Sequence, residues 1–126
     1  MLLSLLISCG RAGYTSTPDH SPGAVDVVAP GDWNDVDAAV WAVAGRVEAA
    51  VVSASATPDL WRHELLSIND ERIVLETTRE PGHEDRLRLR ADVGFHGDRA
   101  RAAALVRAVA RRLHDLKGVE VAPLRD

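Results

Sequence analysis

The sequence offers few side chains that could carry out chemistry, and its one cysteine, Cys9, is the most distinctive of them. A single thiol excludes both an internal disulfide and a zinc cluster built on cysteines. The histidines His63, His83 and His96 do not form the H-E-x-x-H pattern of a zinc protease, and no serine stands in a G-x-S-x-G turn. We therefore predict no catalytic residue, no metal site and no cofactor.

Cys9 ends the apolar segment MLLSLLISC, which has several interpretations. The run from Leu2 to Ile7 is far shorter than the roughly 20 residues of a membrane-spanning helix. It could be the apolar part of a cleaved secretory signal peptide, or a buried strand or helix in which Cys9 is a small apolar residue. No Lys or Arg precedes Leu2, so a signal peptide would need basic residues from a start codon further upstream.

A third interpretation comes from the residues Leu6-Ile7-Ser8-Cys9, which resemble the lipobox of bacterial lipoproteins. The resemblance implies that residues 1–8 are removed as a signal peptide and that Cys9 becomes the first residue of the mature protein, its sulfur carrying a diacylglycerol. It also implies a lipid-anchored protein of the cell envelope. Gly10, in place of an Asp, implies the outer membrane, facing the periplasm, where the organism has one.

Residues 10–23, GRAGYTSTPDHSPG, are rich in Gly, Ser, Thr and Pro and have no hydrophobic periodicity, as is typical of a flexible tether. At about 5–6 Å × √n, such a tether reaches roughly 20 Å. A tether directly after Cys9 favours the lipobox interpretation, because a lipid-anchored domain must stand away from the membrane surface.

Behind the tether we place one domain, at residues 32–126. Before it, residues 9–31 comprise the cysteine, the tether and a short strand within 24–32, with Val25 and Val27 on one side. Residues 33–52 are predicted to form an amphipathic helix that Asp32 or Asn34 caps and that residues 53–59 break. Its apolar stripe comprises Trp33, Val36, Val40, Val43, Val47 and Val51.

Three strands are predicted next, at residues 60–68, 72–79 and 86–93, the first two joined by a turn at Asn69-Asp70. The third alternates between an apolar face and a charged face, which indicates a sheet with one buried side. Its apolar residues are Leu87, Leu89, Ala91 and Val93, and its charged residues are Arg86, Arg88, Arg90 and Asp92. Glu64 and Glu76 on the earlier strands are expected to pair with these arginines.

A second amphipathic helix is predicted from an N-cap at Asp98 to a C-cap at Gly118, followed by a tail that adds a strand or packs loosely. Its apolar face comprises Ala102, Leu105, Val106, Val109, Leu113 and Leu116. Its opposite face carries Arg101, Arg107, Arg111 and Arg112.

These elements predict an α+β fold, with a small three- to four-stranded, mainly antiparallel sheet and two amphipathic helices packed on one face. The order of helix, strands and helix is similar to that of small envelope-assembly lipoproteins such as the LPS-assembly lipoprotein family. The likeness lies in arrangement and anchor, without a shared motif.

A net charge of −4 argues against binding to nucleic acid, which rests on neutralised phosphates. We predict a non-enzymatic, lipid-anchored envelope protein that binds or assembles with another envelope component, with no small-molecule substrate.

Trp41, about 100–120° from the valine stripe, should be half-exposed. The candidate interaction residues are Trp41, Arg88, Arg90, Arg101, Arg107 and Arg111. The alternatives are a small ligand-binding or enzymatic domain that uses the histidine-bearing loops, and a cytoplasmic domain with a misread start.

Overall fold

The computed structural model describes residues 23–94 and 97–117. Predicted features outside that part of the chain are Cys9 with the signal peptide and tether, His96, Gly118 and the C-terminal tail. In chain order the elements are β1 (Val25–Pro30), the 3₁₀ helix η1 (Trp33–Asp35), α2 (Val36–Arg46), β2 (Ala49–Ala56), β3 (Leu60–Ser67), β4 (Arg72–Arg79), β5 (Arg86–Val93) and α3 (Arg99–Leu116).

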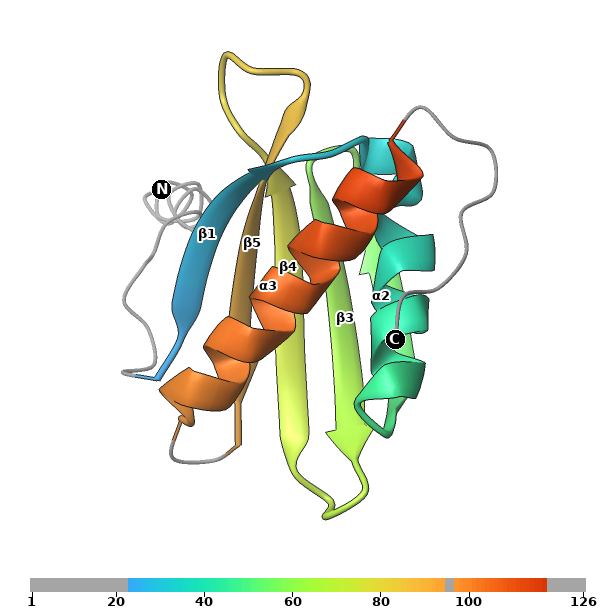
Figure 1. The fold of residues 1–126 in the computed structure, drawn as a ribbon, viewed down its shortest axis with the longest axis vertical. Helices are drawn as coiled ribbons and strands as arrows, with labels where there is room; N and C mark the ends of the chain where they lie inside the picture. Colours follow the sequence, from blue (N-terminus) through green and yellow to red (C-terminus); the bar gives the residue numbers. More distant parts are fainter. Residues whose placement is uncertain (1–22, 95–96, 118–126) are drawn as a thin grey trace, which may run out of the picture.

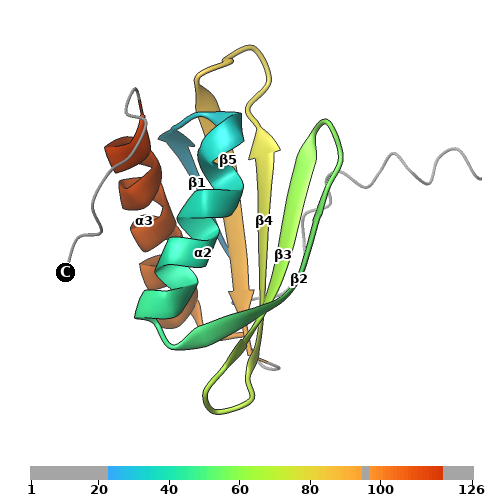
Figure 2. The same ribbon diagram turned by 90° about the vertical axis from the view of Figure 1, so that its right-hand side faces the viewer.

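The strands form one sheet in the order β1-β5-β4-β3-β2, and every neighbouring pair is antiparallel. Both helices lie on one face of this sheet, α3 against β1 and β5 and α2 against β2 and β3 (Figures 1 and 2). The predicted class, an α+β domain with an antiparallel sheet and two helices, is confirmed. Within the described residues the sheet has five strands, however, and not the three or four that we predicted.

β1 is part of this sheet along its whole length. It pairs with β5 from Val25, opposite Ala91, to Pro30, opposite Arg86. Val25 and Val27 share the inner face with the buried Ala29, as their spacing predicted. The domain therefore includes residues 25–30, which we had placed before it.

β2 is the main departure from the predicted structure. The helix predicted over residues 33–52 ends at Arg46, Glu48 adopts a left-handed backbone with φ 60°, and Ala49 begins a strand. The strand runs to Ala56, through much of the segment predicted to be a breaker. The reason is that the β-branched Val51 and Val52 are favoured in a strand, where β3 satisfies the backbone groups.

α3 and the hairpin formed by β3 and β4 agree with the prediction. Asp98 caps α3, its Oδ1 accepting a hydrogen bond of 3.1 Å from the backbone N–H of Arg101. The backbone turns at Asn69-Asp70, where Asp70 has a φ of 63°. All six apolar residues predicted for the inner face of α3 are buried: Ala102, Leu105, Val106, Val109, Leu113 and Leu116.

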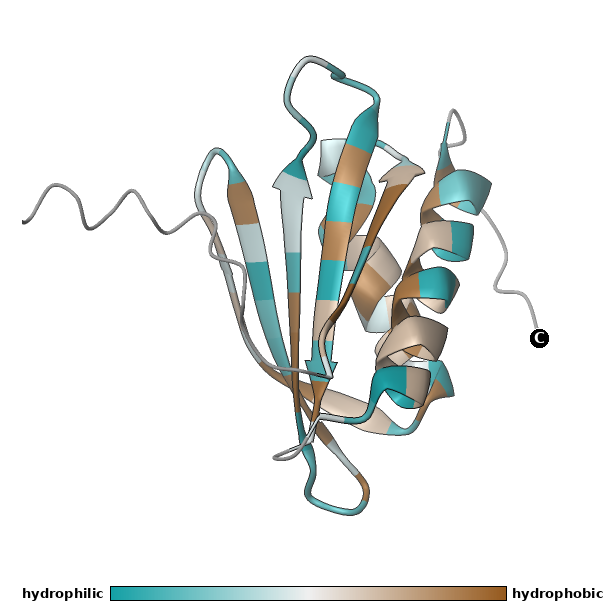
Figure 3. Cartoon of the chain, turned by 90° about the vertical axis from the view of Figure 1, so that its left-hand side faces the viewer, coloured by the Kyte–Doolittle hydropathy of each residue, from teal (hydrophilic) through white to brown (hydrophobic). Residues whose placement is uncertain are grey.

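The core lies between the sheet and the two helices. Hydrophilic and hydrophobic residues alternate along the strands, so that one face of the sheet is apolar and the other wet (Figure 3). On β5 the four predicted inward residues are at most 1% exposed. From α2 the stripe residues Val36, Val40 and Val43 complete the core, whereas Val47 is exposed.

Candidate binding site along the edge strand

β2 is the last strand on its side of the sheet, so one edge of its backbone faces away from every other described strand. Its sequence, AAVVSASA, contains no charged residue and no proline. Proteins usually protect such an edge with charges, prolines or a covering element, because an open edge pairs readily with another chain. The opposite edge strand, β1, has both kinds of protection, in Asp26 and Pro30.

The second half of β2 is exposed on both of its faces. Ala54 and Ala56 stand opposite His63 and Trp61 in the register, on the side of the helices, yet both alanines are exposed. The register shifts by a bulge between Val51 and Ser53. In Figure 2 this end of the β2–β3 hairpin leans away from α2. The helix layer therefore covers only the first half of the strand.

Several large exposed hydrophobic side chains lie on the elements around this strand. Five of the six within the described part of the chain lie on α2 or directly after it, on β2, or on β3 and in the turn that follows it. They are Trp41 (53% exposed), Val47, Val52, Leu66 and Ile68. Leu66 lies on the outer face of the sheet, between the buried Leu65 and Ser67, whereas Trp41 lies on the helix side. We use the name β2 edge for Ala49–Ala56 together with Trp41. An open strand edge with an exposed tryptophan beside it is an arrangement expected of a protein-binding surface.

A buried histidine next to this surface joins β3 to α2. His63, on β3, is 0% exposed, and its ring stacks on Trp61 with the centroids 5.1 Å apart. Its Nε2–H donates a 2.9 Å hydrogen bond to the carboxylate of Asp37 on α2. Trp41 follows Asp37 by one helical turn and so lies on the same side of the helix, toward β2. The hydrogen bond thus fixes the side of α2 that presents Trp41.

Trp41 is as exposed as its position off the valine stripe predicted. The sequence did not reveal the strand beside it, because residues 49–52 were assigned to the helix and 53–59 to a breaker. The signal that could have found it is the uncharged run of alanine, valine and serine, which lacks both the charges of an exposed helix and the glycines of a loop.

The predicted arginines on the sheet lie on its outer, wet face. Arg88 forms ion pairs with Asp26 (3.4 Å) and Glu80 (3.0 Å). Arg90 stands between Asp26 and Glu76 in the register but forms no ion pair with a described residue. The expected partners of these two arginines are engaged elsewhere, since Glu76 pairs with Arg62, and Glu64 pairs with Arg62 and Arg72.

The predicted arginines on α3 lie in the helix layer, on the other side of the molecule from Arg88 and Arg90. Arg101 pairs with Glu71, whereas Arg107 and Arg111 are exposed and have no ion pair with a described residue. The six candidate interaction residues therefore lie in three places: the sheet face, α3 and, for Trp41, the β2 edge.

The described histidines do not converge on a common site. His63 is buried in β3, and His83 is exposed in the connection between β4 and β5. Within residues 23–94 and 97–117, no group of three or more His, Cys, Asp or Glu side chains could hold a metal ion. In the same part of the chain, neither helix is long and apolar enough to cross a membrane.

Comparison of the sequence with models of known protein families and with curated proteins finds no match. The candidate site therefore rests on the geometry of this chain alone.

Proposed function

We propose that this protein is a lipid-anchored envelope protein that binds a partner by accepting an extended segment as a sixth strand on the β2 edge. The observation that carries the proposal is the uncharged, proline-free edge of β2, exposed on both faces and flanked by Trp41. A binding role agrees with the function predicted from the sequence and needs no catalytic group.

The chemistry of the edge defines the partner segment. Backbone N–H and C=O groups on a free edge supply the main-chain hydrogen bonds of strand addition, and side chains beside the strand select the sequence. Alanine and serine at residues 53–56 leave room for side chains of the incoming strand on both faces. Because the edge carries no charge, the matching segment is extended and uncharged, with apolar residues that contact Trp41 and Val52.

The anchor places this module at a membrane. A diacylglycerol on Cys9, followed by the tether at residues 10–23, would hold the domain within roughly 20 Å of the surface. The test is the mass of the mature N-terminus purified from native membranes. We expect a chain that begins at a diacylated Cys9, and loss of membrane attachment in Cys9→Ala. An unmodified thiol in a chain that still begins at Met1 would contradict the anchor.

The binding edge can be tested by cross-linking in the cell envelope. A photo-reactive residue replaces Ser55 on β2, and the matched control replaces Val28, an exposed residue on the opposite edge strand. We expect one discrete cross-linked product at Ser55, none at Val28, and loss of the product in Ala54→Lys, which places a charge on the edge. A product of twice the mass would identify the partner as a second copy. Equal labelling at both positions would contradict the proposal.

A further inference from the structure

The helix layer carries a concentration of positive charge on an otherwise acidic protein. Residues 99–117 hold six of the chain's 15 Lys and Arg residues but one of its 19 Asp and Glu residues, while the whole chain has a net charge of −4. On the sheet face Arg62, Arg72 and Arg88 pair with acidic residues, whereas Arg90 does not. α3 therefore carries more positive than negative charge: Arg101 pairs with Glu71, whereas Arg107 and Arg111 have no ion pair with a described residue.

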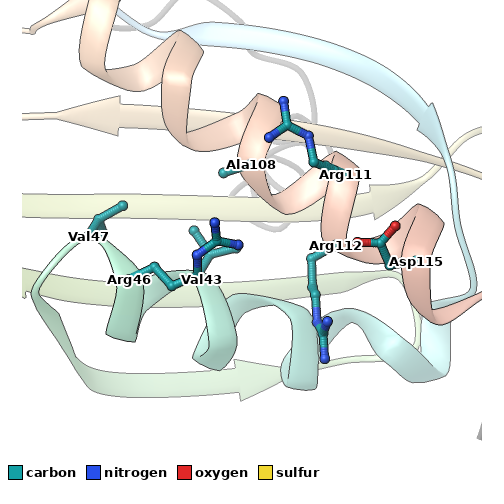
Figure 4. Close-up of a pocket in the computed structure, with 7 residues that line it drawn as sticks. All are labelled: Val43, Arg46, Val47, Ala108, Arg111, Arg112 and Asp115. Carbon is teal, nitrogen blue, oxygen red and sulfur yellow. The ribbon is translucent and has the colours of Figure 1, made fainter. Parts of the chain in front are cut away.

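A groove of about 200 Å³ lies between α2 and α3 at this surface (Figure 4). Apolar side chains and four charged side chains line it: Val43, Val47 and Ala108, with Arg46, Arg111, Arg112 and Asp115. Arg46 extends from α2 and the other charged residues from α3. Arg46 and Arg111 are exposed and form no ion pair with a described residue. Two guanidinium groups from different helices thus face one groove without a carboxylate partner of their own.

The lining fits a phosphate that is attached to an apolar group. A guanidinium fork matches phosphate oxygens in two parallel hydrogen bonds, and two such groups can grip one phosphate from both sides. The apolar wall formed by Val43, Val47 and Ala108 suits the less polar part of the same molecule. The groove is smaller than typical pockets for whole small molecules, which favours a headgroup that inserts alone. We propose that this groove binds the phosphate of an anionic lipid headgroup.

The point at which the described chain begins agrees with this partner. Arg99, at the start of α3, donates a hydrogen bond of 3.0 Å to the backbone oxygen of Ala24, so the chain enters the domain beside this helix. An anchor at Cys9 would therefore draw the α3 side toward the membrane. This step rests on the proposed anchor, whereas the charge and the groove do not.

The experiment uses the full chain with Cys9→Ala, so that acylation plays no part. Binding of this protein to phosphatidylcholine vesicles is measured with and without phosphatidylglycerol. The same measurement is made on the groove double variant, Arg46→Gln with Arg111→Gln, and on a control double variant, Arg72→Gln with Arg86→Gln. Both pairs remove two exposed arginines, the second pair from the strands β4 and β5. We expect the groove pair to lower the partition that depends on phosphatidylglycerol by roughly 10- to 30-fold, since each basic residue near a membrane surface contributes about 1 kcal/mol.

Three outcomes would overturn the inference. Equal losses in the two double variants would mean attraction by net charge alone, without a site in the groove. Partition that does not depend on phosphatidylglycerol would exclude an anionic headgroup. Binding of glycerol phosphate that is as tight as vesicle binding, detected by NMR shifts at Val43 and Ala108, would assign the site to a soluble phosphate compound. Because this experiment uses Cys9→Ala, a negative result would not contradict the proposed anchor or the proposed binding at the β2 edge.

Discussion

Nε2 of His63, on β3, lies 2.9 Å from Oδ1 of Asp37, on α2, and this hydrogen bond joins the helix layer to the sheet next to the β2 edge. The two ends differ in environment, since the His63 side chain is 0% exposed and that of Asp37 is 44% exposed. The bond therefore satisfies a donor that has no access to water, and it holds α2 against the strand that neighbours β2.

Asp37→Ala should lower the free energy of unfolding by about 1–3 kcal/mol, because it leaves the buried Nε2–H of His63 without an acceptor. Asp37→Asn keeps an acceptor oxygen and should lose less. Urea unfolding measures both, with Asp59→Ala, at an exposed loop residue, as a control expected to change by less than about 0.5 kcal/mol. If the alanine and asparagine variants unfold at the same midpoint as the parent protein, the bond does not stabilise the fold.

Glu48→Gly should stabilise the protein by roughly 1 kcal/mol, because Glu48 has a left-handed backbone with φ 60° directly after α2. The continuous helix that the sequence predicted over residues 33–52 would give the opposite sign, since glycine inside a helix costs about 1 kcal/mol. Thermal unfolding of this one variant therefore distinguishes the two structures of the segment.

Asp35→Asn should stabilise the protein at neutral pH by less than about 0.5 kcal/mol. Desolvation by burial, together with the nearby negative charge of Asp32, raises the pKa of Asp35 above its usual 3.8. The folded state thus binds this proton more tightly than the unfolded state, so the ionised carboxylate is unfavourable at neutral pH and its protonation stabilises the fold as the pH falls. The gain from Asn should disappear below pH 3.8, where the carboxyl is protonated in both states. A gain of the same size at pH 7 and in acid would contradict this account.

Trp41→Ala should strongly reduce the cross-link formed from Ser55 while the unfolding midpoint changes little. The tryptophan is 53% exposed, so it adds little to the core, but exposed tryptophans often dominate the energy of an interface. Val28→Ala, at an exposed residue of the opposite edge, is the matched control and should keep the full yield of the cross-link. An unchanged yield in Trp41→Ala would remove this side chain from the binding surface.

The sequence correctly predicted the elements whose pattern of apolar residues fits only one kind of secondary structure. Strict alternation identified β5, and a stripe of six apolar residues identified α3, because each pattern fits one kind of element. The segment after Arg46 was ambiguous, since Val47 and Val51 lie four residues apart and Ala49 and Val51 lie two apart. The choice depends on the pairing of β2 with β3, a contact between segments that a local pattern does not contain.

The candidate site was predictable only in part for the same reason. The exposure of Trp41 followed from its angle on α2, but its neighbours could not be known without β2. The arginines were assigned correctly to polar faces, but the acidic residues with which they pair were not predicted correctly. Arg90 has Asp26 and Glu76 opposite it, while Glu76 bonds Arg62 instead. Side chains this long choose among several acids within reach, so register alone does not decide which ion pairs form.

Amide hydrogen exchange along β2 tests the central claim most directly, because strand addition creates main-chain hydrogen bonds on an edge that is otherwise open. The exchange is compared between the free protein and the complex captured in the envelope. We predict that the amides of residues 49–56 on the open side exchange rapidly in the free protein and become protected in the complex, while those of β1 do not change. Equally fast exchange of β2 in both states, with new protection on another face, would contradict the proposed function.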